Sequence, residues 1–219
     1  MRDQIIEFYN APDLQRLNSY YNRTTIFNIL NIERRELSHS AFLKWLFDIN
    51  GSHNFGEEPL KKLLRMLVNT DNDNILSEDI LNILLIGDYE IQNFHIETEK
   101  VVESDKNKGR IDIFAKFNIF KENSEKDFKK DIIVIIENKV DSKHHDDQTT
   151  TYKEWAEKKY NESVIIPIYL TPYPENEKNE IANYFIITYQ DVLEHVIEPL
   201  LNMEMDSDTK IILEDYIIN

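Results

Sequence analysis

The hydrophobic positions of the first 92 residues recur with the period of an α-helix. The stretch ELSHSAFLKWLFDI, residues 36–49, places apolar side chains four residues apart, and EEPLKKLLRMLV, residues 57–68, repeats the pattern. Pro59 falls in the first turn of the second stretch, where its missing N–H costs little. A third helix is predicted in SEDILNILLI, with Ser77 as its N-cap. The N-terminal part is therefore expected to be helical.

The pattern changes to that of β-strands near residue 93. The segments with strand character are residues 94–102, 109–117, 132–136, 163–171 and 183–189. The first two alternate between polar and apolar side chains, as half-buried strands do. Ile132–Ile136 is an unbroken β-branched run, which predicts a strand buried on both faces. Pro167 is a potential interruption of the fourth segment.

Helical patterns return between and after the last strands. They cover residues 146–159, 190–203 and 208–218, and the first begins with acidic residues that suit the positive end of the helix dipole. Helices followed by three strands, a helix and further strand predict an α/β fold with a mixed central sheet flanked by helices. We expect one domain in three parts: a helical part at 1–92, a sheet core at 93–190 and C-terminal helices at 191–219.

The composition excludes several classes of protein. With 219 residues and 41% hydrophobic content the chain can bury a core, and without cysteine it has neither disulfides nor a cysteine-based zinc site. No segment resembles a signal peptide or a membrane span, so we expect a cytoplasmic protein without membrane contact. The net charge of −16 disfavours a general nucleic-acid coat protein. It leaves open a local basic groove, a metal-bridged phosphate or a partner subunit with a positive surface.

Charged residues close the most hydrophobic strand. The buried run in DIIVIIENKV, residues 131–140, is followed by Glu137 and Lys139, which are two residues apart and so share one side of the strand. An acid two residues before a lysine also occurs elsewhere in the chain, but there in polar or helical segments. Context therefore marks this pair as a candidate site.

A second carboxylate, Asp112, lies inside the preceding strand. A hairpin between the two strands could bring Asp112 near Glu137, and two adjacent carboxylates repel unless they share a cation or a proton. Carboxylate oxygens suit Mg²⁺ or Mn²⁺, and Lys139 could then orient a water or stabilise a phosphate. A structural Asp–Lys or Arg110–Glu pair at the strand end explains the same charges equally well.

The following helix adds two polar residues. Gln148 and Tyr152 are four residues apart and share one helix face, from which they could hold a phosphate or the attacking water. The ordinary alternative is that Tyr152 packs on the sheet and Gln148 reaches solvent.

Together these motifs resemble the PD-(D/E)XK nuclease superfamily. Some bacterial members read G-R-I-D, then I-E-N-K, then Q-x-x-x-Y, which matches residues 109–112, 136–139 and 148–152 in the same order. They also carry an upstream helix with Glu followed by His-Ser and a Leu-rich run, as residues 36–47 do here. The resemblance spans roughly residues 33–190, although Ile111 replaces the proline of the name.

The resemblance implies a restriction-endonuclease-like core, in the order α-β-β-β-α-β with extra helices at both ends. It implies that Mg²⁺ or Mn²⁺ is bound by Asp112, Glu137 and the Asn138 carbonyl, with Lys139 as the catalytic lysine. It also implies that Glu36 is the acid on the upstream helix that completes the site, and that Gln148 and Tyr152 form its supporting wall. The implied activity is hydrolysis of phosphodiester bonds by in-line attack of water, in DNA rather than RNA, in bacterial defence against foreign DNA.

Other functions remain open. The same fold could form a catalytically silent binding or regulatory module, which the negative charge favours and the complete acid–acid–lysine set disfavours. The chain could also be a nuclease subunit that needs a partner, or a homo-oligomer.

Weaker signals have plain alternatives. The KHHDDQ segment, residues 143–148, contains His and Asp side chains, but neighbours in a helix point apart, so a solvated helix start is expected. Glu97 and Glu99 are expected on the solvent-exposed face of the first strand. Glu99 is the better candidate of the two for a role in the site. His53 is expected to be an exposed loop histidine, with substrate contact as the alternative.

Overall fold

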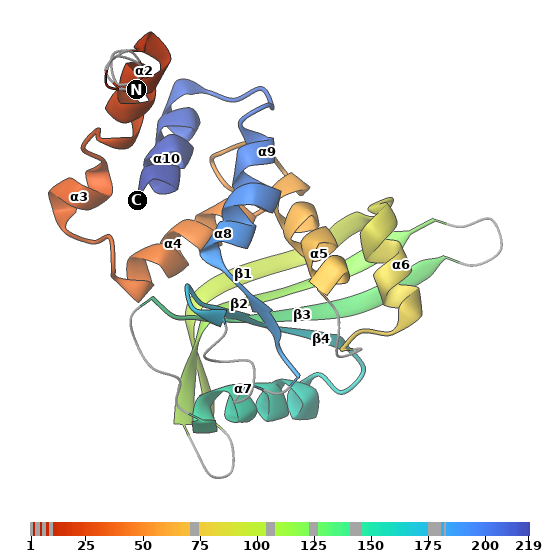
Figure 1. Cartoon of the computed structure of the whole chain (residues 1–219). Helices are drawn as coiled ribbons and strands as arrows, with labels where there is room; N and C mark the ends of the chain where they lie inside the picture. Colours follow the sequence, from red (N-terminus) through yellow and green to blue (C-terminus); the bar gives the residue numbers. More distant parts are fainter. Residues whose placement is uncertain are drawn as a thin grey trace.

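A mixed five-stranded sheet forms the centre of the protein (Figure 1), as a computed structural model shows. The structure describes residues 11–70, 75–103, 108–122, 127–140, 146–174, 181 and 183–219, together with Arg2, Ile5 and Phe8. The strands are β1 (Glu90–Glu103), β2 (Lys108–Lys121), β3 (Phe128–Asn138), β4 (Val164–Leu170) and β5 (Phe185–Ile187). They lie in that order, and β1–β2 and β2–β3 are antiparallel while β3–β4 and β4–β5 are parallel.

Helices cover both faces of this sheet. The helices are α2 (Pro12–Tyr21), α3 (Ile26–Leu30), α4 (Glu36–Phe47), α5 (Glu58–Thr70), α6 (Glu78–Ile86), α7 (Asp146–Lys159), α8 (Tyr189–Val192), the π-helix η2 (Leu193–Ile197), α9 (Glu198–Leu200) and α10 (Ser207–Ile218). Figure 1 shows α7 on one face and α4, α5 and the C-terminal helices on the other. The predicted α/β fold, with its α-β-β-β-α-β core from α4 to β4, is confirmed. No helix of the described residues is long and apolar enough to cross a membrane.

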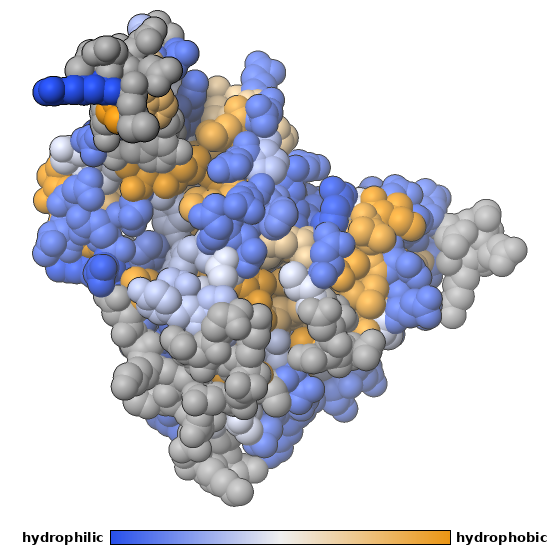
Figure 2. All heavy atoms as spheres, in the orientation of Figure 1, coloured by the Kyte–Doolittle hydropathy of each residue, from blue (hydrophilic) through white to orange (hydrophobic). Residues whose placement is uncertain are grey.

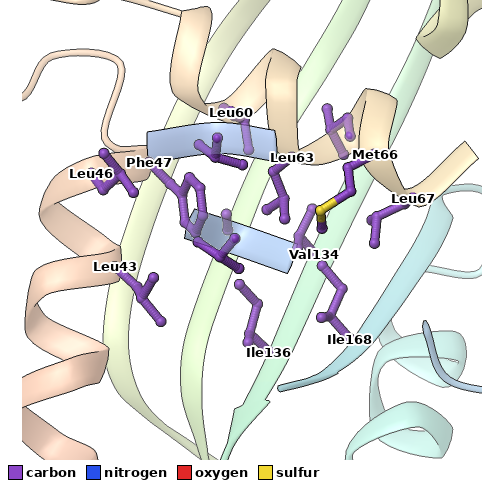
Figure 3. Close-up of a cluster of buried hydrophobic side chains, with 14 of the residues drawn as sticks. Leu43, Leu46, Phe47, Leu60, Leu63, Met66, Leu67, Val134, Ile136 and Ile168 are labelled. Carbon is purple, nitrogen blue, oxygen red and sulfur yellow. The ribbon is translucent and has the colours of Figure 1, made fainter. Parts of the chain in front are cut away.

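The buried strand β3 separates two hydrophobic clusters. Its even-numbered residues from Ile132 to Ile136 face the larger cluster, and Ile133 and Ile135 face the smaller cluster under α7. In the larger cluster (Figure 3), side chains of α4 and α5 meet the sheet; the labelled ones are Leu43, Leu46, Phe47, Leu60, Leu63, Met66, Leu67, Val134, Ile136 and Ile168. The β-branched run has no polar alternation because both of its faces are covered, as predicted.

Pro167 does not interrupt its strand, which corrects the expectation above. It lies within β4, in register with Ile135 of β3. The described pairing of β4 with β5 begins only at Ile168, so no paired strand is opposite Pro167 on that side. A proline without an N–H is tolerated where one side of the strand needs no donor.

The long strands β1 and β2 bend next to α7. Ile111 and Phe114, three residues apart, both belong to the cluster under α7, so the alternation of β2 changes between them. Opposite this point Glu99 of β1 has a φ of 60°, in the left-handed region that is unusual for a residue with a side chain. In Figure 1 the two strands turn away from the rest of the sheet here. Asp112 lies at this bend, directly after the last residue pair of β2 and β3, Ile113 with Ile136.

The C-terminal helical segment departs from a regular α-helix. It contains the π-helical turn η2, in which the N–H of Glu198 donates to the carbonyl of Leu193. Pro199 follows directly and has no N–H with which to continue the α-helical ladder, which accounts for the wider turn. The periodicity of residues 190–203 alone predicted an uninterrupted helix.

Candidate active site

Pairing of β2 with β3 brings the two predicted carboxylates together. Ile113 is paired with Ile136, so Asp112 lies opposite Glu137. Oδ2 of Asp112 accepts a hydrogen bond of 2.7 Å from the backbone N–H of Asn138, and Nζ of Lys139 lies 2.8 Å from Oε1 of Glu137. The backbone N–H of Lys139 donates to Leu170 of β4, which fixes the residue beyond the end of β3. The hairpin inferred from the sequence therefore exists.

Glu137 and Lys139 are shielded from water to an unusual degree for charged groups, and Asp112 is half-buried. Glu137 is 2% exposed and Lys139 is 8% exposed. Burial, together with the charge of Asp112, raises the pKa of Glu137 to about 7 although Lys139 opposes the shift. Burial also raises the pKa of Asp112 to about 6, and the charges of Glu36 and Glu99 add to this. Burial would lower the pKa of Lys139, but the neighbouring carboxylates outweigh it and the pKa is raised.

The donor set fits a divalent cation. Oε2 of Glu137 is buried, and no hydrogen-bond partner for it exists among the described residues. A buried carboxylate oxygen without a partner is costly, and a cation would satisfy it. Within the described ranges no three Asp, Glu or His side chains converge as a metal-binding cluster. The oxygen atoms that could bind a metal here are those of Asp112, Glu137 and the Asn138 carbonyl, with water completing the shell, as Mg²⁺ commonly retains water.

We expect the metal-free protein to lose stability as the pH rises. Both raised pKa values mean that the folded state binds more protons than the unfolded state, so the free energy of unfolding falls between about pH 4 and about pH 7. Mn²⁺ binds the ionised carboxylates and should offset this loss, most strongly above about pH 7. Thermal melts across this range, in EDTA and in Mn²⁺, would measure both effects. A melting temperature that changes with pH in the same way in EDTA and in Mn²⁺ would contradict the expectation.

The side chain of Asn138 joins the strand end to two helices. Its Nδ2 donates to the backbone carbonyl of Glu36 (3.1 Å) and to Oγ of Ser40 (3.0 Å), and its Oδ1 accepts from the hydroxyl of Tyr189. Oε1 of Glu36 in turn accepts from the N–H of Val140 at 3.2 Å. The start of α4 is thus fixed against the end of β3, which puts Glu36 beside the two carboxylates.

Tyr152 packs on the sheet and forms hydrogen bonds with the backbone at the start of β2. It is 1% exposed, and its hydroxyl donates to the carbonyl of Arg110 (3.0 Å) and accepts from the N–H of the same residue (3.1 Å). This agrees with the packing alternative for Tyr152 and places its hydroxyl on backbone atoms two residues before Asp112. Gln148 lies in α7, but its side chain is outside the described part of the structure.

An arginine–glutamate pair exists, but it does not involve the two central carboxylates. Nε of Arg110 lies 2.8 Å from Oε2 of Glu99, which is opposite Asp112 in the β1–β2 register. Glu97 instead contacts Lys100 at 2.6 Å and His95 at 3.1 Å. The structural pair that the sequence offered as an alternative is therefore present beside the candidate site without engaging Asp112 or Glu137.

Two further expectations have different outcomes. His53 is buried rather than exposed: its ring contacts Trp45 and Phe55, and its Nδ1 accepts from the N–H of Phe55. The prediction of an exposed loop histidine was wrong because the loop folds back onto α4. The suggested cluster in residues 143–148 lies outside the described side chains.

Sequence reasoning missed two residues that hold the site. Tyr189 carried no signal, because it lies 51 residues from Asn138 and ends a strand pattern. Ser40 was visible only as part of the Glu-x-x-His-Ser pattern, without a role. The structure gives it one, since its hydroxyl accepts from Asn138.

The sheet order and the flanking helices define a restriction-endonuclease-like fold. A family model described as PD-(D/E)XK nuclease superfamily matches residues 24–217. The chain therefore belongs to the PD-(D/E)XK nuclease superfamily, whose members are generally nucleases that use divalent metals. Comparisons with curated proteins and with solved structures gave no match. Membership indicates a metal-dependent nuclease with a nucleic-acid substrate.

Proposed function

We propose that this protein hydrolyses phosphodiester bonds in DNA with Mg²⁺ or Mn²⁺, and that it serves in bacterial defence against foreign DNA. The observation that carries the catalytic proposal is that Asp112 lies opposite the buried Glu137, with the Lys139 ammonium 2.8 Å from Glu137. A purely structural ion pair needs one acid and one base. A second carboxylate and an unpartnered buried oxygen cost stability without a cation, which supports a functional site.

Each residue has a distinct task in this proposal. Asp112, Glu137 and the Asn138 carbonyl hold the divalent ion, which supplies a Lewis acid for the phosphate. Lys139 keeps its proton, so its ammonium orients the attacking water and stabilises the negative charge that develops on the phosphate. Glu36 adds an acid from α4 next to these groups.

The supporting residues hold the catalytic groups in position. Tyr152 is a positioning residue, since its hydroxyl is bonded to the Arg110 backbone. We propose that Gln148 supports the phosphate or the water from the same helix. Arg110 is exposed at the rim, where its guanidinium beside Glu99 offers a contact for the phosphate backbone.

Cleavage of mixed substrates is the direct test of this function. Plasmid, linear duplex, single-stranded DNA and RNA are each incubated with Mg²⁺, with Mn²⁺ and with EDTA. We expect DNA cleavage that needs metal and that falls at least about 10²-fold in Lys139→Ala, because the ammonium acts on the developing charge. Lys129→Ala, an exposed position on the same strand, is the matched control and should cleave normally.

Lack of cleavage by the wild-type protein would favour the binding or regulatory module, to which the net charge of −16 lends some support. Metal binding separates the remaining cases. A protein that binds Mn²⁺ through Glu137 but does not cleave needs a partner or a particular target, and one that binds none is a scaffold.

A partner or a second copy has apolar surface available. Leu85 and Ile86 are exposed on α6, and Ile29 and Leu30 on α3. Figure 2 shows the apolar area over α6, surrounded by polar residues. Sedimentation of the purified protein would establish whether two copies associate.

A further inference from the structure

A pocket of about 250 Å³ lies directly beside the candidate active site. Val140, which follows Lys139, is part of its lining, and so is Tyr189, whose hydroxyl donates to Asn138. The segment before α4 and the helix α10 close its other sides. The pocket and the candidate active site are thus connected through Val140 and Tyr189.

The floor of this pocket is aromatic and uncharged. Nε2 of His39 lies 2.7 Å from the carbonyl of Glu33, which can only accept, so Nε2 carries the ring proton. Nδ1 then accepts from the hydroxyl of Tyr216 at 3.0 Å. The ring of His39 contacts those of Tyr189 and Tyr216 edge-on, at 5.2 and 5.6 Å. Burial lowers the pKa of His39, which keeps the ring neutral. Such a rigid, neutral floor suits a planar ring and offers nothing to a phosphate.

The mouth of the pocket, unlike its neutral floor, is exposed and carries a charged side chain. Tyr173, which is 61% exposed, and Arg34, which is exposed as well, both line the pocket. The carboxylate of the neighbouring Glu33 accepts a hydrogen bond from Asn28. An exposed phenol ring and a guanidinium at the edge of an aromatic pocket can stack on a base and contact its phosphate.

We propose that this pocket receives an unpaired nucleobase of the substrate strand, next to the phosphate that is cleaved. The proposal rests on the proposed nuclease function and adds the form of the substrate to it. A base inside a duplex is stacked and paired, and must be turned out before it can enter a pocket. The protein should therefore prefer single-stranded or locally unpaired DNA.

Equilibrium binding without cleavage tests the proposal. A fluorescent single-stranded oligonucleotide and a blunt duplex of the same sequence are titrated with the protein in EDTA. We expect tighter binding of the single strand, and a Kd raised about 10-fold in Tyr173→Ala, since stacking on one aromatic ring contributes about 1–3 kcal/mol per base. Tyr173→Phe keeps the ring and should bind as the wild-type protein does.

A second variant fills the pocket from its far side. Ile217 of α10 lines the pocket and lies away from the carboxylates, so Ile217→Trp should weaken single-strand binding and leave Mn²⁺ binding unchanged. Thermal melting shows whether the variant is folded. Equal single-strand binding by wild type, Tyr173→Ala and Ile217→Trp would overturn the proposal.

The test separates this proposal from the nuclease function itself. If the wild-type protein cleaves DNA while both variants bind and cleave normally, the nuclease function stands and the base pocket is wrong. If dAMP alone binds the pocket while oligonucleotide affinity is unaffected by both variants, the pocket takes a free nucleotide, and the proposal is again overturned. If the single strand binds through Tyr173 but no cleavage occurs with any metal, the base pocket holds and the catalytic proposal fails.

Discussion

Replacing Glu137 with glutamine is expected to reduce metal-dependent cleavage by at least about 10³-fold and to weaken Mn²⁺ binding by at least about 10²-fold. The substitution keeps the shape of the side chain and removes its charge. The neutral amide oxygen of glutamine is a weaker ligand for a divalent cation than an ionised carboxylate, because it contributes no charge. The fold should survive, because burial disfavours the charged form of Glu137 and raises its pKa to about 7, so a neutral side chain of the same shape should cost little there.

The measurement pairs Mn²⁺ titration calorimetry with the cleavage assay, above about pH 7 so that the wild-type carboxyl is ionised. Glu90→Gln is the matched control, because it makes the same chemical change at an exposed residue. Glu90 begins β1 and is in register with Phe120, at the end of β2 that is farther from Asp112. A Glu137→Gln protein with normal Mn²⁺ affinity would show that Glu137 is only the structural partner of Lys139.

The central pair of carboxylates could be predicted because it depends on local chain geometry. The buried run of β3 can be recognised from its unbroken β-branched residues, and consecutive strands commonly pair as a hairpin. Once Ile113 pairs with Ile136, Asp112 must lie opposite Glu137. The contact of Lys139 with Glu137 follows from the two-residue period of a strand.

The rest of the site depends on contacts between distant segments. Asn138 bonds to Ser40 over a separation of 98 residues and to Tyr189 over 51 residues. No periodicity along the chain encodes such a pairing. The left-handed φ of Glu99 is similarly invisible, because glutamate has no preference for that region. His53 was misjudged because a loop histidine is buried only when the loop folds back onto a helix.

The structure also shows that Gly109 and Tyr152, which come from two different motifs, depend on each other. A Cβ atom at Gly109 would lie 2.4 Å from Cε1 of Tyr152 and 3.2 Å from its hydroxyl oxygen. The tyrosine ring is 1% exposed and has no room to retreat. Glycine is therefore required at the start of β2 by the tyrosine of α7, whose hydroxyl holds both backbone groups of Arg110. Separated by 43 positions in the sequence, the two residues form one contact.

Gly109→Ala is accordingly expected to lower the free energy of unfolding by about 2–3 kcal/mol, since overpacking in a buried site typically costs about 1–3 kcal/mol. Tyr152→Ala should lower it by about 3–5 kcal/mol through the cavity that it leaves. In the double variant the clash is absent, so adding Gly109→Ala to Tyr152→Ala should cost less than about 1 kcal/mol. The reduced backbone entropy of the unfolded alanine chain could even make this step stabilising.

Urea unfolding of the four proteins measures this cycle. Tyr152→Phe serves as the control for the ring alone: it retains the clash with an added Cβ, and it leaves the N–H and carbonyl of Arg110 without the hydroxyl, which costs about 1–3 kcal/mol. Strictly additive effects of Gly109→Ala and Tyr152→Ala would contradict the close packing. Cleavage should remain low in the double variant, whose stability stays close to that of Tyr152→Ala, because the backbone two residues before Asp112 is no longer held. Recovery of full activity there would show that Tyr152 stabilises the fold without positioning the site.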